Sequence, residues 1–366
     1  MSDGFFKRNA QYLFRAWVDF RFHPRPGVWL VRLGTLLLLA LLAGWTFGAS
    51  IPTANGPLSI GFSTGGTPLF VSIAALAVAL LFIALGVSRV RRDFRNQDRQ
   101  RVIVLEVRGL RDTSGTPLTD AVPKTIRGRR IPILADLRQG QDGAISAPDI
   151  ALKRIEALPF NIADQESGAD RADVQLVLGG LAPVPYSFLT GLLVDDESKV
   201  TVMDWNRGGE RWAALDQEDD GRRFVASGLD AVPADADAVV LAVSVSYGVD
   251  HAGIAAAFPG LPLVELKLED GGPDAHWSAE KQAALARQFH EMAIALGNRG
   301  VRLVHLILAA QNSVVLNFGR AYDKRNLPPL IVYQYERGRV PAYPWGVQMP
   351  VAGAREATLI NRDGTA

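Results

Sequence analysis

The sequence contains no cysteine, which removes disulfides, thiolate metal ligands, iron–sulfur clusters and a cysteine nucleophile from consideration. It also lacks a G-x-x-x-x-G-K-[ST] phosphate loop, a G-x-G-x-x-G turn after a strand and a G-x-S-x-G elbow. Histidine is scarce, and the five residues do not have the spacing of metal ligands: His23, His251, His276, His290 and His305. Nothing in these patterns supports hydrolysis, phosphoryl transfer or redox chemistry.

Charge is missing from one long part of the chain, because residues 33–88 contain no Asp, Glu, Lys or Arg. The flanking segments 1–32 and 89–101 each carry six basic and two acidic residues. Residues 102–366 carry 27 basic and 34 acidic residues. The net charge of +1 therefore hides two basic flanks and an acidic remainder. That acidity argues against DNA or RNA polymers as partners.

Two apolar runs fill the uncharged stretch, at about 28–49 and 68–87. Each has about 20 residues, enough for a helix to cross a bilayer core about 30 Å thick. We therefore predict a transmembrane hairpin over 27–90, and the basic flanks place both termini in the cytoplasm. Neither span contains an acid, a lysine or a histidine, which argues against a proton relay or ion-coupled transport. Small residues in the second span predict close helix contacts: Ser72, Ala75 and Ala79.

Two short segments flank the hairpin. Residues 1–26 place Phe5, Tyr12 and Trp17 near one helical face among basic residues, which predicts an interfacial amphipathic segment on anionic lipid. A frayed tail is the alternative for so short a segment. Residues 91–101 are predicted to be an Arg-rich linker.

Residues 102–366 alternate short β-branched apolar runs with helical patterns, which is typical of α/β layers with largely parallel strands. The clearest helix is predicted over 278–297, with Ser278 as its N-cap. The segment after residue 338 is predicted to be a C-terminal tail or an edge segment.

An internal repeat divides this region. Segment 176–191 resembles 306–319, and 200–207 resembles 330–337, both with an offset of 130 residues. The repeat predicts two α/β halves related by duplication, at about 102–230 and 236–345. A third pair lies near the head of each half: 101–109 and 238–246.

A ligand site is predicted from the sheet geometry. In open α/β sheets, ligands bind beyond the carboxyl ends of the strands, where helix N-termini present backbone N–H groups. Aromatic side chains there can stack on bases. Candidate cations for phosphate contacts are Lys199, Arg207, Arg320, Lys324 and Arg337. Arg207 and Arg337 occupy equivalent places in the repeat, with ordinary surface charge as their alternative. The candidate ligand-binding residues are Gly179, Gly180, Tyr186, Ser187, Trp205, Arg207, Ser246, Tyr247, His251, Gln311, Asn312, Ser313, Tyr335 and Arg337.

The duplicated region resembles the SAVED domain, a fusion of two CARF-like Rossmann subunits found in bacterial CBASS anti-phage systems. The resemblance covers most of 102–345 and is carried by VTVMDWNRGGERWAAL (200–215), VVLAVSVSYGVD (239–250) and LVHLILAAQNSVVLNFGRAYDKRNLPPLIVYQYE (303–336). A two-span hairpin ahead of such a domain is similar to the membrane-spanning SAVED effectors. The expected fold is therefore α/β, with a two-helix transmembrane hairpin followed by a SAVED sensor domain over 102–366.

The resemblance implies a sensor that binds a cyclic oligonucleotide, typically a cyclic trinucleotide, made by a cognate nucleotidyltransferase. Ligand binding is expected to assemble the protein into oligomers or filaments. The hairpins then disrupt the bacterial inner membrane, which gives abortive infection. This function needs no catalytic residue, metal or cofactor beyond the activating ligand. Two alternatives remain open: a membrane-anchored Rossmann-like enzyme acting on a nucleotide or sugar nucleotide, and a passive membrane-tethered scaffold.

Overall fold

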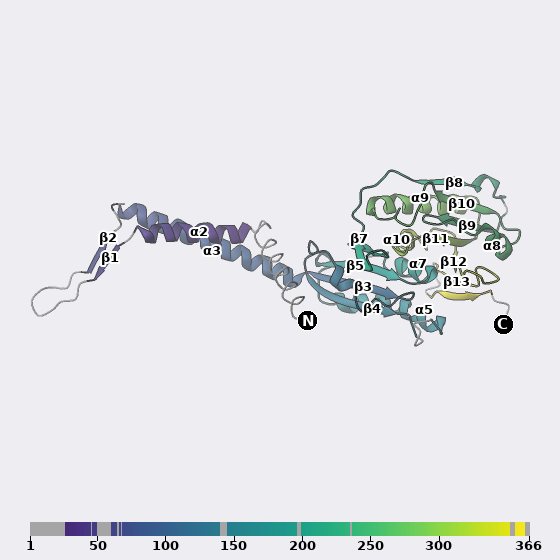
Figure 1. Ribbon diagram of the computed structural model, residues 1–366, viewed down its shortest axis with the longest axis horizontal. Helices are drawn as coiled ribbons and strands as arrows, with labels where there is room; N and C mark the ends of the chain where they lie inside the picture. Colours follow the sequence, from purple (N-terminus) through teal and green to yellow (C-terminus); the bar gives the residue numbers. More distant parts are fainter. Residues whose placement is uncertain are drawn as a thin grey trace, which may run out of the picture. The chain divides into compact units, whose positions relative to one another are not determined.

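The computed structural model describes residues 26–44, 46–49, 60–63, 66, 68–139, 145–195, 199–234, 236–351 and 356–362. The chain divides into two compact units, Met1–Asp98 and Arg99–Ala366 (Figure 1). The predicted amphipathic segment, residues 1–26, lies outside the described residues except at Pro26.

The first unit contains two apolar helices, α2 (Pro26–Ala43) and α3 (Leu69–Arg99). Within α3, Leu69–Arg92 is the one stretch in the described residues that is long and apolar enough to cross a membrane. The helix α2 ends six residues before the predicted span does. A short antiparallel ribbon follows it, made of β1 (Thr46–Ala49) and β2 (Ile60–Ser63). The β-branched and aromatic residues Thr46 and Phe47 favour a strand there, once Gly44 has weakened the helix.

The helices α2 and α3 pack closely through small residues. A Cβ atom on Gly34 would lie 2.7 Å from the Ala79 carbonyl oxygen, and one on Gly86 would lie 2.7 Å from the Gly27 carbonyl oxygen. Ser72 and Ala79 are both buried. The close contact predicted for the small residues of the second span therefore forms within the hairpin itself.

The second unit contains two sheets whose central strands are parallel. The first sheet has the order β4-β3-β5-β6-β7, with only β7 antiparallel. Its strands are β3 (Arg101–Arg108), β4 (Arg129–Asp136), β5 (Val174–Leu181), β6 (Val200–Asn206) and β7 (Arg211–Ala214). The second sheet has the order β14-β13-β12-β11-β9-β10-β8, with β8, β13 and β14 antiparallel to their neighbours. Its strands are β8 (Phe224–Ser227), β9 (Ala238–Ser244), β10 (Leu263–Leu268), β11 (Leu303–Ala309), β12 (Leu330–Gln334), β13 (Trp345–Gln348) and β14 (Thr358–Asn361).

The helices of this unit lie mainly between the two sheets. One apolar core joins the inner faces of both sheets with α5, α6, α7, α9 and α10, whereas α4 and α8 cover the outer faces. Figure 1 shows α7 and α10 between the strands of the two sheets. The helices are α4 (Leu118–Ala121), α5 (Pro148–Glu156), α6 (Leu158–Glu166), α7 (Val184–Leu193), α8 (His251–Ala257), α9 (Ala279–Asn298) and α10 (Asn312–Ala321), with short 3₁₀ turns η1 (Arg171–Asp173) and η2 (Leu229–Ala231).

The two sheets repeat one topology. The parallel order β4-β3-β5-β6 in the first corresponds to β10-β9-β11-β12 in the second. The three segment pairs that resemble each other in sequence are β3 and β9, β5–α7 and β11–α10, and β6 and β12. Each pair occupies equivalent places in its sheet, which is the arrangement expected of a duplicated α/β unit. The strand β8 belongs to the second sheet, so the sheets divide the chain between Ala214 and Phe224, whereas the sequence predicts the division at 230–236.

The two halves meet at a close crossing of α7 with α10. A Cβ atom on Gly191 would lie 2.1 Å from the Leu316 carbonyl oxygen, and one on Gly319 would lie 2.0 Å from the Phe188 carbonyl oxygen. The contact is reciprocal, because Phe188 precedes Gly191 by three residues just as Leu316 precedes Gly319. Only glycine permits this approach, so these two repeated residues allow the backbones of α7 and α10 to pack in direct contact.

Several local expectations agree with the structure. Ser278 caps α9, since its Oγ accepts a hydrogen bond from the Lys281 backbone N–H at 3.2 Å. The strands β13 and β14 make the C-terminal segment an edge of the second sheet. The predicted Arg-rich linker is instead helical, because α3 continues to Arg99 and the single residue Gln100 joins it to β3. The arginine-rich sequence without Gly or Pro favours helix there.

Candidate ligand-binding site

The residues predicted at the carboxyl ends of the first sheet are mostly buried. Gly179 lies under Trp212, since a Cβ atom there would meet the ring at 2.9 Å, and Gly180 faces Val107 and Leu316. Tyr186 is fully buried, and its hydroxyl donates to the Pro148 carbonyl at 2.9 Å. Burial raises the pKa of this hydroxyl above its ordinary value. These residues therefore shape the core beneath the site.

The N-terminus of α7 is already hydrogen-bonded by side chains of the second half. Asn312 Oδ1 accepts from the Ala182 backbone N–H at 3.3 Å and from the Ser187 hydroxyl at 2.6 Å. Gln334 Oε1 accepts from the Val184 backbone N–H at 2.9 Å. Donors predicted to be available for a ligand are thus used to join the halves.

The N-terminus of α10 is hydrogen-bonded by Asp204 of the first half and by Gln282 of its own half. The Ser313 backbone N–H donates to the buried carboxylate of Asp204, at the end of β6, at 3.1 Å. Gln282 donates to the Ser313 hydroxyl at 2.8 Å and to the His276 carbonyl at 2.6 Å. The Nε2 atom of His276 lies 3.4 Å from Asp204 Oδ2. Burial lowers the pKa of His276, and the Asp204 charge acts against that shift.

The remaining predicted residues differ in exposure. Ser246 is buried and hydrogen-bonds Gln311 Oε1, while Gln311 Nε2 donates to the Pro273 carbonyl at 2.6 Å. Trp205 is buried edge-on against Trp212, with ring centroids 5.4 Å apart. Five predicted residues are exposed at this end of the sheets: Arg207, Tyr247, His251, Tyr335 and Arg337.

A pocket of about 800 Å³ lies elsewhere between the two halves. One wall is the beginning of β6, at Val200–Val202, and the other is the outer face of α9 with the last turns of α10. None of the fourteen predicted residues lines it. Much of the lining is small or apolar: Val200, Val202, Ala214, Leu215, Ala279, Ala283, Ala286 and Ala321.

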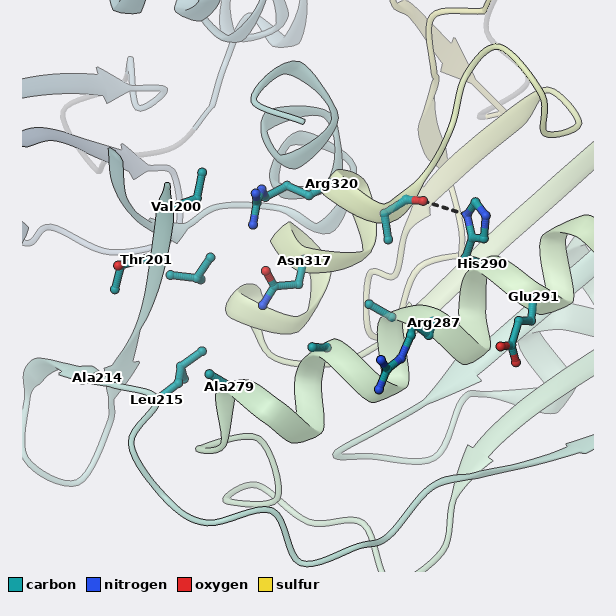
Figure 2. A pocket seen from close by; sticks show the side chains of 14 residues that line it. Val200, Thr201, Ala214, Leu215, Ala279, Arg287, His290, Glu291, Asn317 and Arg320 are labelled. Carbon is teal, nitrogen blue, oxygen red and sulfur yellow. Dashed lines mark hydrogen bonds between the residues drawn. The ribbon is translucent and has the colours of Figure 1, made fainter. Parts of the chain in front are cut away.

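Polar groups reach this pocket mainly from α9 and α10 (Figure 2). Figure 2 shows Arg320 extending from α10 towards β6, with Arg287 on α9 below it. The Nδ1 atom of His290 lies 2.9 Å from the Ala321 carbonyl, which fixes the proton on Nδ1 and leaves Nε2 as an acceptor in the neutral ring. Asn317 donates to Gln282 Oε1 at 2.7 Å. The lining combines two arginines and one carboxylate, that of Glu291, with apolar side chains, and the excess positive charge suits an anionic ligand with flat, apolar parts.

The sequence patterns did not predict this pocket, although they named Arg320 as a candidate cation and gave His290 no role. The structure half-buries His290 against the end of α10. The pattern that marks the pocket is a row of alanines at Ala279, Ala283 and Ala286 on one face of α9. A row of small residues on a helix is not a ligand signal by itself, because it is also typical of close helix packing.

The comparisons with known proteins agree with this architecture. Residues 161–349 match the family described as SAVED, the SMODS-associated and fused to various effectors sensor domain. Residues 7–152 match the family described as Saf_2TM, the SAVED-fused 2TM effector domain. No curated protein sequence matches the chain.

The two family matches divide the chain differently from its structural units. The effector-family match runs to residue 152 and so includes β3 and β4. Those strands belong to the first sensor sheet, because β3 pairs with β5 in parallel along its whole length from Arg101 to Arg108. The sheet that contains β5 and β6 of the SAVED match therefore includes β3, which begins about 60 residues before that match does.

The similar solved structures include SAVED/CARF-domain containing receptors. A Cap4 SAVED/CARF-domain containing receptor of Acinetobacter baumannii with the cyclic trinucleotide 2'3'3'-cAAA is 11% identical, with a TM-score of 0.45, and the match covers 76% of this chain and 58% of that chain. A Cap4 receptor of Moraxella osloensis is 11% identical, with a TM-score of 0.41, over 76% of this chain and 60% of that one. The match thus spans less than two thirds of either receptor chain. Because the sensor family covers more than half of the sequence and follows the effector-family match, this chain belongs to the SAVED family, as a SAVED sensor domain fused to a 2TM effector domain.

Proposed function

We propose that this chain is a CBASS effector whose SAVED domain binds a cyclic oligonucleotide, a cyclic trinucleotide in the first instance, and whose helical hairpin then disrupts the bacterial inner membrane. The observation that carries the proposal is the pocket of about 800 Å³ between the halves of the sensor, with Arg287 and Arg320 beside an apolar wall. A cyclic trinucleotide has three phosphates and three flat bases, which suit these two kinds of lining.

The pocket is the location that we propose for the ligand. Its walls come from both halves, so a bound ligand contacts β6 on one side and α9 and α10 on the other. The carboxyl-end residues predicted from the sequence are the alternative location, with Arg207 and Arg337 exposed there and Tyr247 and Tyr335 available for stacking. On β6, Val202 lines the pocket and Trp205 lies at the carboxyl-end location. Substitutions at one location therefore leave the other unchanged and distinguish the two.

The connection between the two modules favours direct mechanical coupling. The helix α3 ends at Arg99 and β3 begins at Arg101, so one residue separates a membrane-spanning helix from a sensor strand. The strand β3 pairs on both sides, with β4 and β5. We therefore expect a ligand-induced movement of β3 to be transmitted to α3, because no flexible linker separates the two elements.

Assembly supplies the step from binding to membrane damage. A ligand that binds the assembled state more tightly shifts the equilibrium towards oligomers or filaments. Anchoring in the membrane raises the effective concentration of the sensor domains. The proposal includes a multi-pass topology with both termini in the cytoplasm, a cognate nucleotidyltransferase as the source of ligand, and an action that needs no catalysis by this chain.

The test is calorimetric titration of the full chain in nanodiscs with cyclic di-, tri- and tetranucleotides, together with dye release from vesicles that contain it. We expect a cyclic trinucleotide to bind, to increase the particle size and to release the dye. The Arg287→Glu and Arg320→Glu variants are expected to lose binding, whereas Arg207→Glu and Arg337→Glu are matched charge reversals that keep it. Loss of binding in Arg207→Glu and Arg337→Glu, with binding retained in Arg287→Glu and Arg320→Glu, places the ligand at the carboxyl ends of the strands instead. Binding of none of these ligands refutes the function, and their turnover supports the membrane-anchored enzyme instead.

A further inference from the structure

A groove on α3 has the composition of a binding site for one phospholipid molecule. It has a volume of about 650 Å³ and is lined by Leu80, Ile83, Ala84, Val87, Ser88, Arg91 and Arg92. These positions repeat at intervals of three and four residues, so they form one continuous stripe along the helix. The stripe is apolar for its first half and ends in two arginines.

This stripe lies beside the surface of α3 that packs against α2, and Ile83, which approaches Gly34 of α2, belongs to both. Gly86 and Ala79 are buried in the hairpin contact, whereas Leu80, Ala84, Arg91 and Arg92 are exposed. Apart from Ile83, the exposed residues of the groove therefore lie beside the hairpin contact, where lipid surrounds a membrane-spanning helix.

The dimensions of the stripe match one leaflet of a bilayer. From Leu80 to Arg92 the helix rises about 18 Å, and half of a hydrocarbon core is about 15 Å thick. An acyl chain that lies along Leu80, Ile83 and Val87 therefore brings its headgroup to the level of Arg91 and Arg92. Guanidinium groups bind phosphate with paired hydrogen bonds, and the Ser88 hydroxyl is a further donor near the glycerol backbone.

We propose that this groove binds one anionic glycerophospholipid, with an acyl chain against Leu80–Val87 and the phosphate headgroup on Arg91 and Arg92. Charge complementarity selects an anionic over a zwitterionic headgroup, since each basic residue near a membrane surface strengthens the attraction about fivefold. The bound lipid covers one face of α3 and so limits which faces of the hairpin are open to other hairpins. The inference rests on the proposed insertion of α3 in the membrane.

The test uses the full chain reconstituted in vesicles of phosphatidylcholine, with and without added phosphatidylglycerol. Flotation with the pure phosphatidylcholine vesicles checks insertion separately, so failure of the membrane proposal is recognised before the lipid site is assessed. The measured quantity is the association of spin-labelled phosphatidylglycerol relative to spin-labelled phosphatidylcholine. We expect a preference of about 25-fold, about fivefold for each of the two arginines, that saturates at one lipid per chain.

Four variants separate a built site from general surface charge. Arg91→Gln and Arg92→Gln are expected to reduce the preference about fivefold each, whereas Arg89→Gln, outside the groove, leaves it within a factor of two. Ala84→Phe fills the groove without changing charge and is expected to remove the saturable component, whereas Ala77→Phe, on the same helix outside the groove, retains it. Loss in the arginine variants with full retention in Ala84→Phe overturns the proposal, because general surface charge then explains the preference.

Discussion

The crossing of α7 with α10 predicts an unusually severe effect for two small substitutions, Gly191→Ala and Gly319→Ala. The added Cβ atom meets a backbone carbonyl oxygen at 2.1 Å in the first variant and at 2.0 Å in the second, whereas real Cβ contacts stay above about 3.0 Å. A backbone atom has no alternative rotamer, so the two helices must separate by about 1 Å. A gap of that size loses a quarter to a half of each contact energy across the interface.

The side chains at this interface are among the most buried in the molecule, including Phe188, Leu316 and Phe318. Overpacking of a core costs typically 1–3 kcal/mol, and the lack of any flexible neighbour places each variant at about 3 kcal/mol. For a unit of this size, that loss lowers the melting temperature by about 6–12 °C. Thermal unfolding of the full chain in detergent measures it, with Gly272→Ala as the control because a Cβ atom there meets nothing within 4 Å.

The double variant tests whether one helix movement relieves both clashes. One movement of α7 away from α10 relieves both clashes, so the free energies of the two substitutions are not additive. We expect Gly191→Ala/Gly319→Ala to lose about 3–4 kcal/mol, close to either single variant. Single effects below about 1 kcal/mol, or full additivity in the double variant, refute the reasoning.

Three further predictions concern polar groups of the sensor. Burial, with a smaller effect of Arg362, lowers the pKa of His305 to about 4. As the pH falls from 6.5 to 4, the unfolded chain therefore binds a proton that the folded state does not, and we expect urea unfolding to show a loss of up to about 3 kcal/mol of stability in that window. The His305→Gln variant is expected to flatten this loss, whereas the control His251→Gln, at an exposed position, does not. Lys281 is buried, and its Nζ lies 2.8 Å from Asp220 Oδ2. The Asp220→Asn variant leaves this buried cation unpaired and is expected to lose about 1–3 kcal/mol of stability. A Lys281→Met variant that is as unstable as Asp220→Asn contradicts the role of the unpaired charge. Asn312→Ala removes the acceptor of two donors in the first half and is expected to cost about 1–3 kcal/mol in thermal unfolding, whereas Asn312→Asp keeps the acceptor; equal losses in both variants argue against that role.

Local patterns in the sequence were sufficient for the elements and their repetition. The uncharged stretch 33–88 identified two apolar helices, and the resemblance of 176–191 to 306–319 identified equivalent strand–helix pairs. Ser278 marked the start of α9 because a capping residue bonds to a backbone group only three residues away. The recognition of a SAVED sensor with a two-helix effector module is confirmed by the family matches. The fold class is confirmed as well.

The end of α2 shows where local patterns were misleading. Hydropathy continues through residue 49, so the apolar run alone predicts a longer helix. Pairing of Thr46–Ala49 with Ile60–Ser63 competes with helix there. The partner strand lies eleven or more residues away, so the hydropathy of the apolar run carries no information about it. The helix therefore ends where strand pairing begins, and not where the apolar run ends.

Which predicted donors are open to a ligand depended on contacts between residues far apart in the sequence. The sequence placed donors at the N-termini of α7 and α10, but it gave no sign that Asn312, Gln334 and Asp204 already accept from them. Those contacts join residues more than 100 positions apart, across the two halves. Whether a helix N-terminus is open to a ligand is set by such tertiary partners.

The sequence by itself therefore determined the apolar hairpin, the strands and helices of the sensor and their duplication, because each depends on spacing within a few residues or on similarity between segments. The tertiary structure alone decided which glycines are essential, where the halves leave a pocket, and which predicted binding residues are instead buried between them. Those properties depend on how closely α7, α9 and α10 approach one another and β6. That approach is fixed by packing of the complete core and not by the order of residues in any one element.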